Sequence, residues 1–148
     1  LPGDPRPGLV EALKAIGPDG TVLCWNMGFE KGVLEDLAEM FPAEAEFLAG
    51  LVERMDDLII PFRSFWVYHP AQRGNCSLKA VLPALTDFDY DELAIADGNH
   101  AARQYQQALY GNVTVKERVT IFQNLSEYCK LDTMAMVAIL HRLEKLVE

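Results

Sequence analysis

The spacing of apolar residues along the chain predicts a helix-rich protein with a few short extended segments. Apolar positions that recur every three or four residues predict helices over 8–16, 29–40, 42–55, 77–82, 99–110 and 114–147, the last with room for one break. Short runs of apolar and aromatic residues predict strands over 21–25, 58–60 and 62–68. This mixture indicates an α/β or α+β fold in which sequence upstream of Leu1 supplies further strands.

The predicted strand over 21–25 leads directly into the polar turn Asn26 and, four residues later, the carboxylate Glu30. Ligands of open α/β sheets bind at the carboxyl ends of strands, so this turn is a candidate site for a cation or a substrate. The alternative is structural: Asn26 ends the strand and caps the next helix, and Glu30 stabilises the first helical turn.

The C-terminal helix carries an aspartate beside its apolar face. Tyr128 and Asp132 are four residues apart and therefore share one side of a helix. An aspartate on the inward flank needs a hydrogen-bond donor, a charged partner or a metal. A helix break near 129–132, with Asp132 as the N-cap of a second helix, is the alternative. The predicted inward face comprises Phe122, Leu125, Cys129, Met136, Leu140, Leu143 and Val147.

The composition is that of one compact domain over 1–148: the chain has 148 residues, of which 50% are apolar. No apolar run is long enough to span a bilayer, so no membrane partner is expected. Three widely spaced cysteines predict buried free thiols in a reducing compartment, hence a cytoplasmic protein. The net charge of −9 argues against broad nucleic-acid adhesion but is compatible with an acidic site that holds cations.

The segment 62–79 combines aromatic residues with four basic side chains, those of Arg63, His69, Arg73 and Lys79. Such a mixture can stack on and follow a single nucleic-acid strand. The alternative is an ordinary strand with its aromatic residues in the core, and burial of Trp66 would favour it. The acidic run 86–92 reads as a turn, because it lacks the glycine and the distal glutamate of a calcium loop.

Two motifs resemble those of the DnaQ-like, DEDD-type 3′–5′ exonucleases of the ribonuclease-H-like superfamily. Asn26-x-x-Phe29-Glu30 after a strand is similar to their second motif, and Tyr128-x-x-x-Asp132 on a C-terminal helix is similar to their third. Over nearly its full length the chain also resembles a bacterial domain of unknown function, number 2779, that is grouped with these nucleases. The shared runs are 26–31, 77–83 and 127–136. The resemblance implies a ribonuclease-H-like fold.

The chain departs from the superfamily pattern in two respects. The second motif ends in Glu30 where the superfamily has aspartate, and the first motif, Asp-x-Glu, is absent. Because the chain starts with a turn-rich, linker-like stretch at 1–7 and lacks an initial methionine, we expect an N-terminal truncation that removes this first motif.

The chemistry implied by the resemblance is hydrolysis of DNA or RNA phosphodiester bonds with two Mg²⁺ or Mn²⁺ ions about 4 Å apart. Glu30 and Asp132 would be metal ligands together with upstream carboxylates, and Tyr128 would orient the attacking water. Asn26, Phe29, His69, Arg73 and Lys79 are candidate contacts to single-stranded ends. The chain alone is expected to bind metal weakly and to be inactive or impaired. A domain that has lost catalysis and acts as a binding or regulatory module is the alternative.

Overall fold

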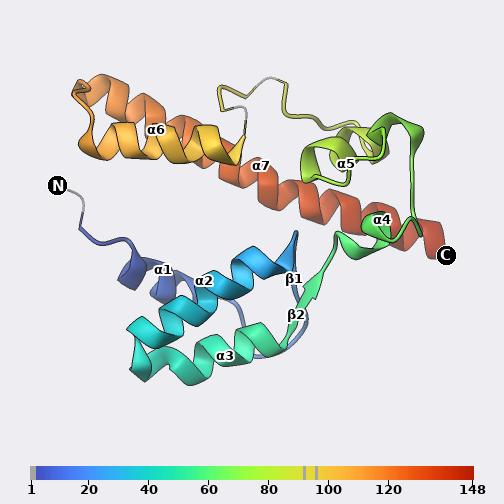
Figure 1. Cartoon of the computed structure of the whole chain (residues 1–148), viewed down its shortest axis with the longest axis horizontal. Helices are drawn as coiled ribbons and strands as arrows, with labels where there is room; N and C mark the ends of the chain where they lie inside the picture. Colours follow the sequence, from blue (N-terminus) through green and yellow to red (C-terminus); the bar gives the residue numbers. More distant parts are fainter. Residues whose placement is uncertain (1–2, 92, 96) are drawn as a thin grey trace. The chain divides into compact units, whose positions relative to one another are not determined.

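The computed structural model describes residues 3–91, 93–95 and 97–148, which divide into two compact units (Figure 1). The N-terminal unit is Pro2–Val67 and the C-terminal unit is Tyr68–Glu148. The expectation of one domain over 1–148 stays a prediction.

The N-terminal unit is built around two short parallel strands joined by a helical crossover. β1 pairs with β2 in a register that places Cys24 opposite Asp57. Because the strands are parallel, their carboxyl ends meet at the same edge, where Asn26 and Leu58 leave the sheet. The elements of the unit are α1 (Arg6–Leu13), β1 (Val22–Cys24), α2 (Met27–Met40), η1 (Pro42–Glu44), α3 (Ala45–Glu53), β2 (Met55–Asp57) and α4 (Ile60–Arg63).

Helices α1, α2 and α3 form the apolar core of this unit. Its buried side chains are Val10, Leu34, Leu37, Leu48 and Leu51. Phe29 and Met40 of α2, which the sequence pattern suggests are inward, are 72% and 48% exposed. Phe29 borders an open cavity, which explains why its ring stays accessible although it follows the apolar spacing of the helix.

Two predicted strands are wrong. Instead of 58–60, the strand is Met55–Asp57. The segment 62–68 contains no strand, and its first two residues belong to the short helix α4. Pro61 explains the helix, because proline is favoured in the first helical turn and cannot donate to a sheet. The sequence pattern does not predict β2, because the adjacent acids Asp56 and Asp57 interrupt the apolar pattern by which strands are recognised.

The C-terminal unit consists of helices that pack on one long helix. The short α5 and the longer α6 both lie against α7, and the predicted helix starts at Ser77 and Thr114 are confirmed. The Thr114 side chain accepts from the Glu117 N–H at 3.2 Å, and the Glu117 carboxylate accepts from the Thr114 N–H at 2.7 Å. The elements are η2 (Pro70–Gln72), α5 (Leu78–Leu85), α6 (Gly98–Tyr110) and α7 (Val115–Val147).

Helix α7 is continuous, so a break near 129–132 with Asp132 as an N-cap is wrong. Its buried residues are Ile121, Tyr128, Ala135 and Ile139. The predicted inward face is rotated by one residue from this stripe: Phe122 is 38% exposed and Val147 is 87% exposed. Apolar residues are frequent enough on α7 to support either face, and packing against α5 and α6 selects one. Among the described helices, none has the length and apolar content needed to cross a membrane.

Candidate functional site

At the carboxyl ends of the two strands, Asp57 holds the start of α2. Its carboxylate accepts hydrogen bonds from the N–H groups of Asn26 and Met27, both at 2.9 Å, and of Ile59 at 3.2 Å. The first amides of a helix have no partners within the helix and carry partial positive charge, so a carboxylate stabilises them. Asp57 is 9% exposed and links β2 to the turn that carries the candidate motif.

Asn26 does not cap α2 with its side chain, which corrects the structural alternative drawn from the sequence. Its backbone is left-handed, with φ of 70°, a conformation that asparagine tolerates better than most residues. Its Oδ1 lies 3.4 Å from Nη2 of Arg63, which donates to it. Asp57 is not among the residues predicted from the sequence, although an acidic pair directly before the buried Leu58 and Ile59 is a signal for it.

Glu30 lies one turn into α2 and presents an oxygen that the protein does not satisfy. Its Oε2 is buried and has no hydrogen-bond partner among the described residues. Burial raises the pKa of this carboxyl, and the charge of Asp57 raises it further, while backbone N–H groups of Glu30 and Trp25 offset part of the effect. The side chain borders a cavity of about 240 Å³ that is otherwise lined by apolar residues such as Leu13, Leu23 and Phe29.

A proton or a cation would stabilise this oxygen, because a buried polar atom without a partner is unfavourable. Hard cations such as Mg²⁺ and Mn²⁺ take carboxylate oxygens, so Glu30 fits the donor type that these ions need. Among residues 3–91, 93–95 and 97–148, no group of three or more His, Cys, Asp or Glu side chains could hold a metal ion. The chain therefore offers carboxylate donors without a complete ligand set in its described part.

Cys24 is a structural thiol beside this carboxylate. Its Sγ donates to the Asp56 carbonyl oxygen at 3.2 Å. Burial raises the pKa of the thiol to about 11, with the charges of Asp57, Glu30 and Asp56 adding to the effect. The thiol stays protonated near neutral pH, so it is not a reactive nucleophile. The three cysteines are free as predicted, but Cys129 is exposed where burial was expected, because the predicted inward face of α7 was rotated.

In the C-terminal unit, Asp132 is held by a tyrosine that the sequence analysis did not single out. The Tyr90 hydroxyl donates to Oδ1 of Asp132 at 2.7 Å. The rings of Tyr90 and Tyr128 pack with centroids 6.3 Å apart. Nζ of Lys79 lies 5.3 Å from the centroid of the Tyr90 ring and 5.7 Å from that of Tyr128. We call Lys79, Tyr90, Tyr128 and Asp132 the tyrosine–aspartate cluster.

The electrostatics of this cluster follow from burial and from the Asp132 charge. Tyr90 and Tyr128 are each 9% exposed. Burial raises the pKa of Tyr128 to about 12, and the nearby charge of Asp132 and a hydrogen bond with it contribute. The same causes raise the pKa of Tyr90. Both phenols are therefore protonated near neutral pH and act as hydrogen-bond donors. Tyr90 and Phe88 are the two aromatic residues of the acidic run 86–92, and no local rule pairs either of them with α7.

The remaining candidates from the segment 62–79 divide into structural and exposed residues. His69 caps η2: its Nδ1 accepts from the Ala71 N–H at 3.2 Å, and its own N–H donates to Oε1 of Gln72 at 2.8 Å. Arg73 is exposed and adopts a left-handed backbone with φ of 50°. Trp66 is 73% exposed, so its ring is accessible for stacking.

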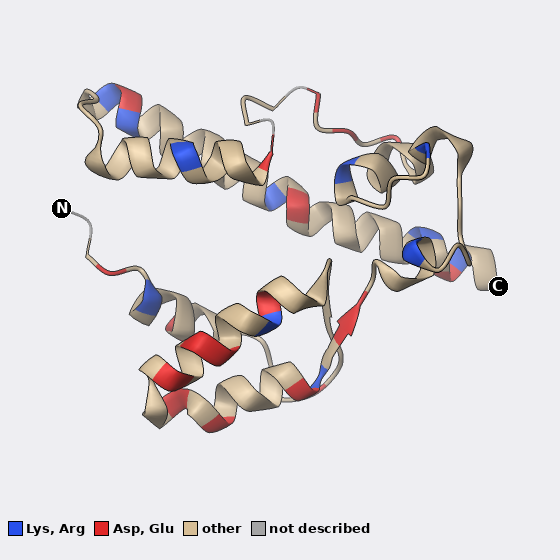
Figure 2. Ribbon diagram, in the orientation of Figure 1, with Lys and Arg blue, Asp and Glu red and all other residues tan. Residues whose placement is uncertain are grey.

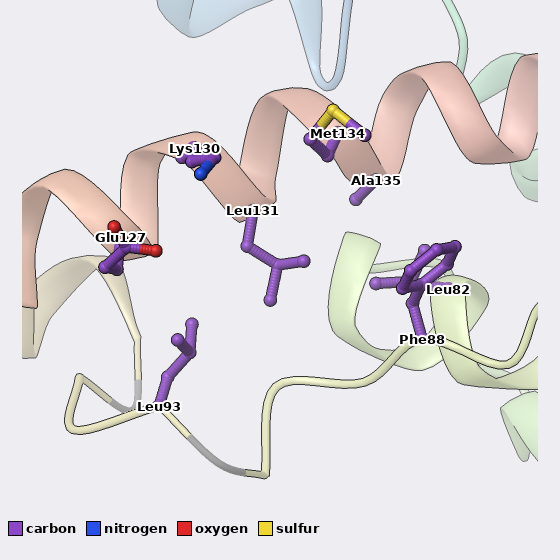
Figure 3. A pocket seen from close by; sticks show the side chains of 8 residues that line it. All are labelled: Leu82, Phe88, Leu93, Glu127, Lys130, Leu131, Met134 and Ala135. Atoms are coloured by element: carbon purple, nitrogen blue, oxygen red, sulfur yellow. The ribbon is translucent and has the colours of Figure 1, made fainter.

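A second cavity, of about 220 Å³, opens in the C-terminal unit between α5, α7 and the loop that follows α5. Figure 3 shows Leu131 of α7 pointing toward the loop that carries Leu93, with Phe88 beside Leu82. Its lining is mostly apolar, and Glu127 and Lys130 provide the charged groups.

The structure thus places the predicted ligands in different units. Glu30 belongs to the N-terminal unit, whereas Tyr128 and Asp132 belong to the C-terminal unit. Tyr128 and Asp132 lie together with Lys79, and the pairing of Glu30 with Asp132 stays a prediction. Acidic residues recur along α2, α3 and β2 within the N-terminal unit, as Figure 2 shows.

Comparison with known proteins gives two findings and no match to a solved structure. The "Uncharacterized protein UU173" of Ureaplasma parvum serovar 3 (strain ATCC 700970) is 23% identical over 168 residues, which cover 98% of this chain and 24% of that protein. The chain therefore spans about a quarter of the length of this relative. The domain of unknown function DUF2779 matches residues 2–77, which include β1, the Asn26–Glu30 turn, β2 and Asp57. On this match the chain belongs to the DUF2779 family.

Proposed function

We propose that this chain is part of a metal-dependent nuclease domain with a ribonuclease-H-like fold that acts as a 3′–5′ exonuclease on DNA or RNA. The observation that carries the proposal is the buried Oε2 of Glu30, which has no partner in the described part of the chain. It lies just beyond the carboxyl end of a strand in a parallel pair, where α/β enzymes bind their ligands. A cation is the partner that suits this oxygen best.

Each residue of the proposed site has a role that its chemistry permits. Glu30 and Asp132 supply carboxylate oxygens for Mg²⁺ or Mn²⁺, and a two-metal site needs further ligands besides these two. Bound metal ions would lower the pKa of the attacking water and stabilise the leaving oxygen. Tyr128, which is protonated near neutral pH, would orient this water through its hydroxyl group. Asp57 fixes the start of α2 and thereby the direction of Glu30.

The substrate of the proposed nuclease is a single-stranded end. Phe29 and Trp66 are 72% and 73% exposed, and Arg63 is exposed as well. Bases stack on exposed aromatic rings irrespective of sequence, and arginine contacts the phosphates. Because the chain carries a net charge of −9, binding would depend on these local contacts and on bound cations.

The test is a metal-dependent nuclease assay on the full-length protein, with wild type compared to Asp132→Asn. A second-shell residue around a metal typically contributes 10–100-fold to activity, so loss of a direct ligand should lower the rate by roughly 100-fold or more. Asp97→Asn is the matched control, because Asp97 is an exposed aspartate of the same unit that caps α6. Equal rates in wild type and Asp132→Asn would remove Asp132 from the mechanism.

One observation favours the alternative, a binding or regulatory module without catalysis. The Tyr90 hydroxyl already satisfies one oxygen of Asp132, so this carboxylate is stable without a cation. The two functions differ in the assay: a module would bind a fluorescent single-stranded oligonucleotide without cleaving it in Mn²⁺. An Asp-x-Glu pair on a strand upstream in the full-length protein would favour the nuclease.

A further inference from the structure

The turn after α4 ends this helix in an arrangement that usually contains glycine. The Trp66 N–H donates to the Pro61 carbonyl oxygen at 2.9 Å, and the Phe65 N–H donates to that of Phe62 at 3.2 Å. These two hydrogen bonds form a Schellman motif, in which the residue just beyond the helix end has a left-handed backbone. Here that residue is Phe65, with φ of 56°. A phenylalanine in this conformation is strained, because its Cβ crowds the following carbonyl oxygen.

Burial in the core does not explain this strain. Phe65 is 67% exposed and Trp66 is 73% exposed. Two large aromatic side chains, which we call the aromatic tip, therefore lie largely in solvent at a turn that favours glycine. Backbone strain of this kind collects at sites that hold ligands.

Helix α4 fixes the aromatic tip to the turn at the carboxyl end of β1. The rings of Phe62 and Trp25 pack with centroids 5.6 Å apart, and Phe62 is 2% exposed. Nη2 of Arg63 donates to Oδ1 of Asn26 at 3.4 Å. The tip is thus carried by a short helix that is anchored beside the Asn26–Glu30 turn, and the same helix supplies the guanidinium group of Arg63.

The charge pattern of the sequence suits an anionic ligand at this tip. Residues 58–86 are the longest stretch of the chain without aspartate or glutamate, and they contain Arg63, Arg73 and Lys79. In a chain with a net charge of −9, an anionic polymer meets the least local repulsion here. Exposed aromatic rings with neighbouring cations bind single-stranded nucleic acid, through base stacking and phosphate contacts.

We propose that the aromatic tip is a base-stacking subsite for single-stranded DNA or RNA, in which the rings of Phe65 and Trp66 contact bases and Arg63 contacts a neighbouring phosphate. This inference rests on the nucleic-acid substrate of the proposed function and deepens it. It adds Phe65 to the substrate contacts and gives its left-handed backbone a role, since this turn leaves both rings accessible. The tip holds the substrate and takes no part in hydrolysis.

The test measures the fluorescence anisotropy of labelled single-stranded oligonucleotides with the full-length protein, in EDTA so that metal-dependent cleavage does not occur. The probes are DNA and RNA of one sequence and an abasic DNA, which keeps the phosphates but lacks the bases. Trp66→Ala should raise the Kd for the base-containing probes by roughly 10-fold or more, as expected for loss of one stacked ring, and leave the Kd for the abasic probe unchanged. Tyr110→Ala is the control, because Tyr110 is a 79% exposed aromatic residue at the end of α6.

Phe65→Gly separates binding from folding. Glycine adopts a φ of 56° without strain, so the Tm of this variant should be no lower than that of the wild type, whereas its Kd for the base-containing probes should rise. If the Tm of Trp66→Ala or Phe65→Gly falls instead, the rings pack on another part of the full-length protein and the proposal is overturned.

The outcomes distinguish this inference from the nuclease activity. If the wild type cleaves and both variants bind the probes as the wild type does, the subsite is overturned and the nuclease stands. An equal rise in Kd for the abasic probe also overturns base stacking. If the wild type binds through the tip but does not cleave in Mn²⁺, the subsite stands and the nuclease falls. A wild type that binds none of the probes overturns the subsite, and its cleavage assay decides the nuclease separately.

Discussion

Glu30 and Asp132 show two ways in which a partly buried carboxylate can exist in this chain. Asp132 accepts a hydrogen bond from the Tyr90 hydroxyl at 2.7 Å, whereas Oε2 of Glu30 is buried without a partner among the described residues. Unsatisfied buried polar groups destabilise a protein and persist where function requires them. Glu30 is therefore the residue at which stability and the proposed function conflict most directly.

Replacing Glu30 by glutamine is expected to stabilise the metal-free chain at neutral pH. Burial raises the pKa of Glu30, so the folded state binds its proton more tightly than the unfolded state. Stability of the wild type then falls as pH rises from about 4.3, the ordinary glutamate value, through the folded pKa. Glu30→Gln removes this loss, so the Tm of the variant at pH 7 should be higher than that of the wild type.

The measurement is Tm against pH in a chelating buffer, with Glu35→Gln as the control. Glu35 is on the same helix, is exposed, and forms only a 3.7 Å ion pair with Lys31. The gain in Glu30→Gln should disappear below about pH 4, because both forms are then uncharged. If the gain in Tm does not depend on pH, the charge of Glu30 does not explain it, and a change in side-chain packing does.

At the scale of elements, the junction between β2 and α2 decides the geometry of the site. Three backbone N–H groups converge on the Asp57 carboxylate, which occupies both of its oxygens. Asp57 of β2 caps the start of α2, whereas the side chain of Asn26 does not. This cap couples the edge of the sheet to the helix. Any change at Asp57 therefore acts on Asn26, Met27 and, through them, on Glu30.

Asp57→Asn should destabilise the chain by about 2 kcal/mol, as expected for loss of hydrogen bonds to a charged group. An asparagine must turn its NH₂ toward one of these donors, because all three need acceptors. Chemical denaturation of the chain measures the effect, and Asp56→Asn is the control because Asp56 is exposed and its side chain accepts only from the adjacent Asp57 N–H in the described structure. Equal stabilities of the two variants would mean that the cap contributes little.

The elements that could be predicted are those with local signals. The helix that begins after Thr114 has a local capping box with Glu117, and the strand over 21–25 is a short apolar run, so the sequence predicts both elements. The strand Met55–Asp57 was missed because its side chains are polar and its evidence is the pairing with β1, a contact between distant residues. The buried face of α7 likewise depends on packing against α5 and α6, which are contacts between distant residues.

The candidate site could be predicted only in part for the same reason. Asn26, Glu30, Tyr128 and Asp132 stand in sequence motifs, whereas Asp57 and Tyr90 act through contacts across 31 and 42 positions of the chain. Local sequence gives at most a weak signal for Asp57 and Tyr90, because their roles depend on partners far away in the chain. The motifs include the candidate ligands, and the structure adds residues that contact them or their helix.

At the scale of the whole molecule, the two proposed carboxylate ligands belong to different units. Glu30 belongs to the unit that the family match covers, and Asp132 lies outside residues 2–77. The relative is matched over only 24% of its length, so further parts of such a protein can contribute ligands. If the two carboxylates hold the same pair of cations, they are energetically coupled although they fold in different units.

A double-mutant cycle in the full-length protein tests this coupling. Glu30→Gln, Asp132→Asn and the double variant are compared in their rate of oligonucleotide cleavage at fixed Mn²⁺. Residues that act as one unit are non-additive, so the double variant should be no more than about 3-fold slower than the slower single variant. If the two residues act independently, the rate losses of the single variants multiply. Two 100-fold losses would then give roughly a 10⁴-fold loss in the double variant. Glu30→Gln with Asp97→Asn is the control pair, because Asp97 caps α6. A multiplicative result for Glu30 and Asp132 would separate the two carboxylates and leave Glu30 as a ligand of some other group.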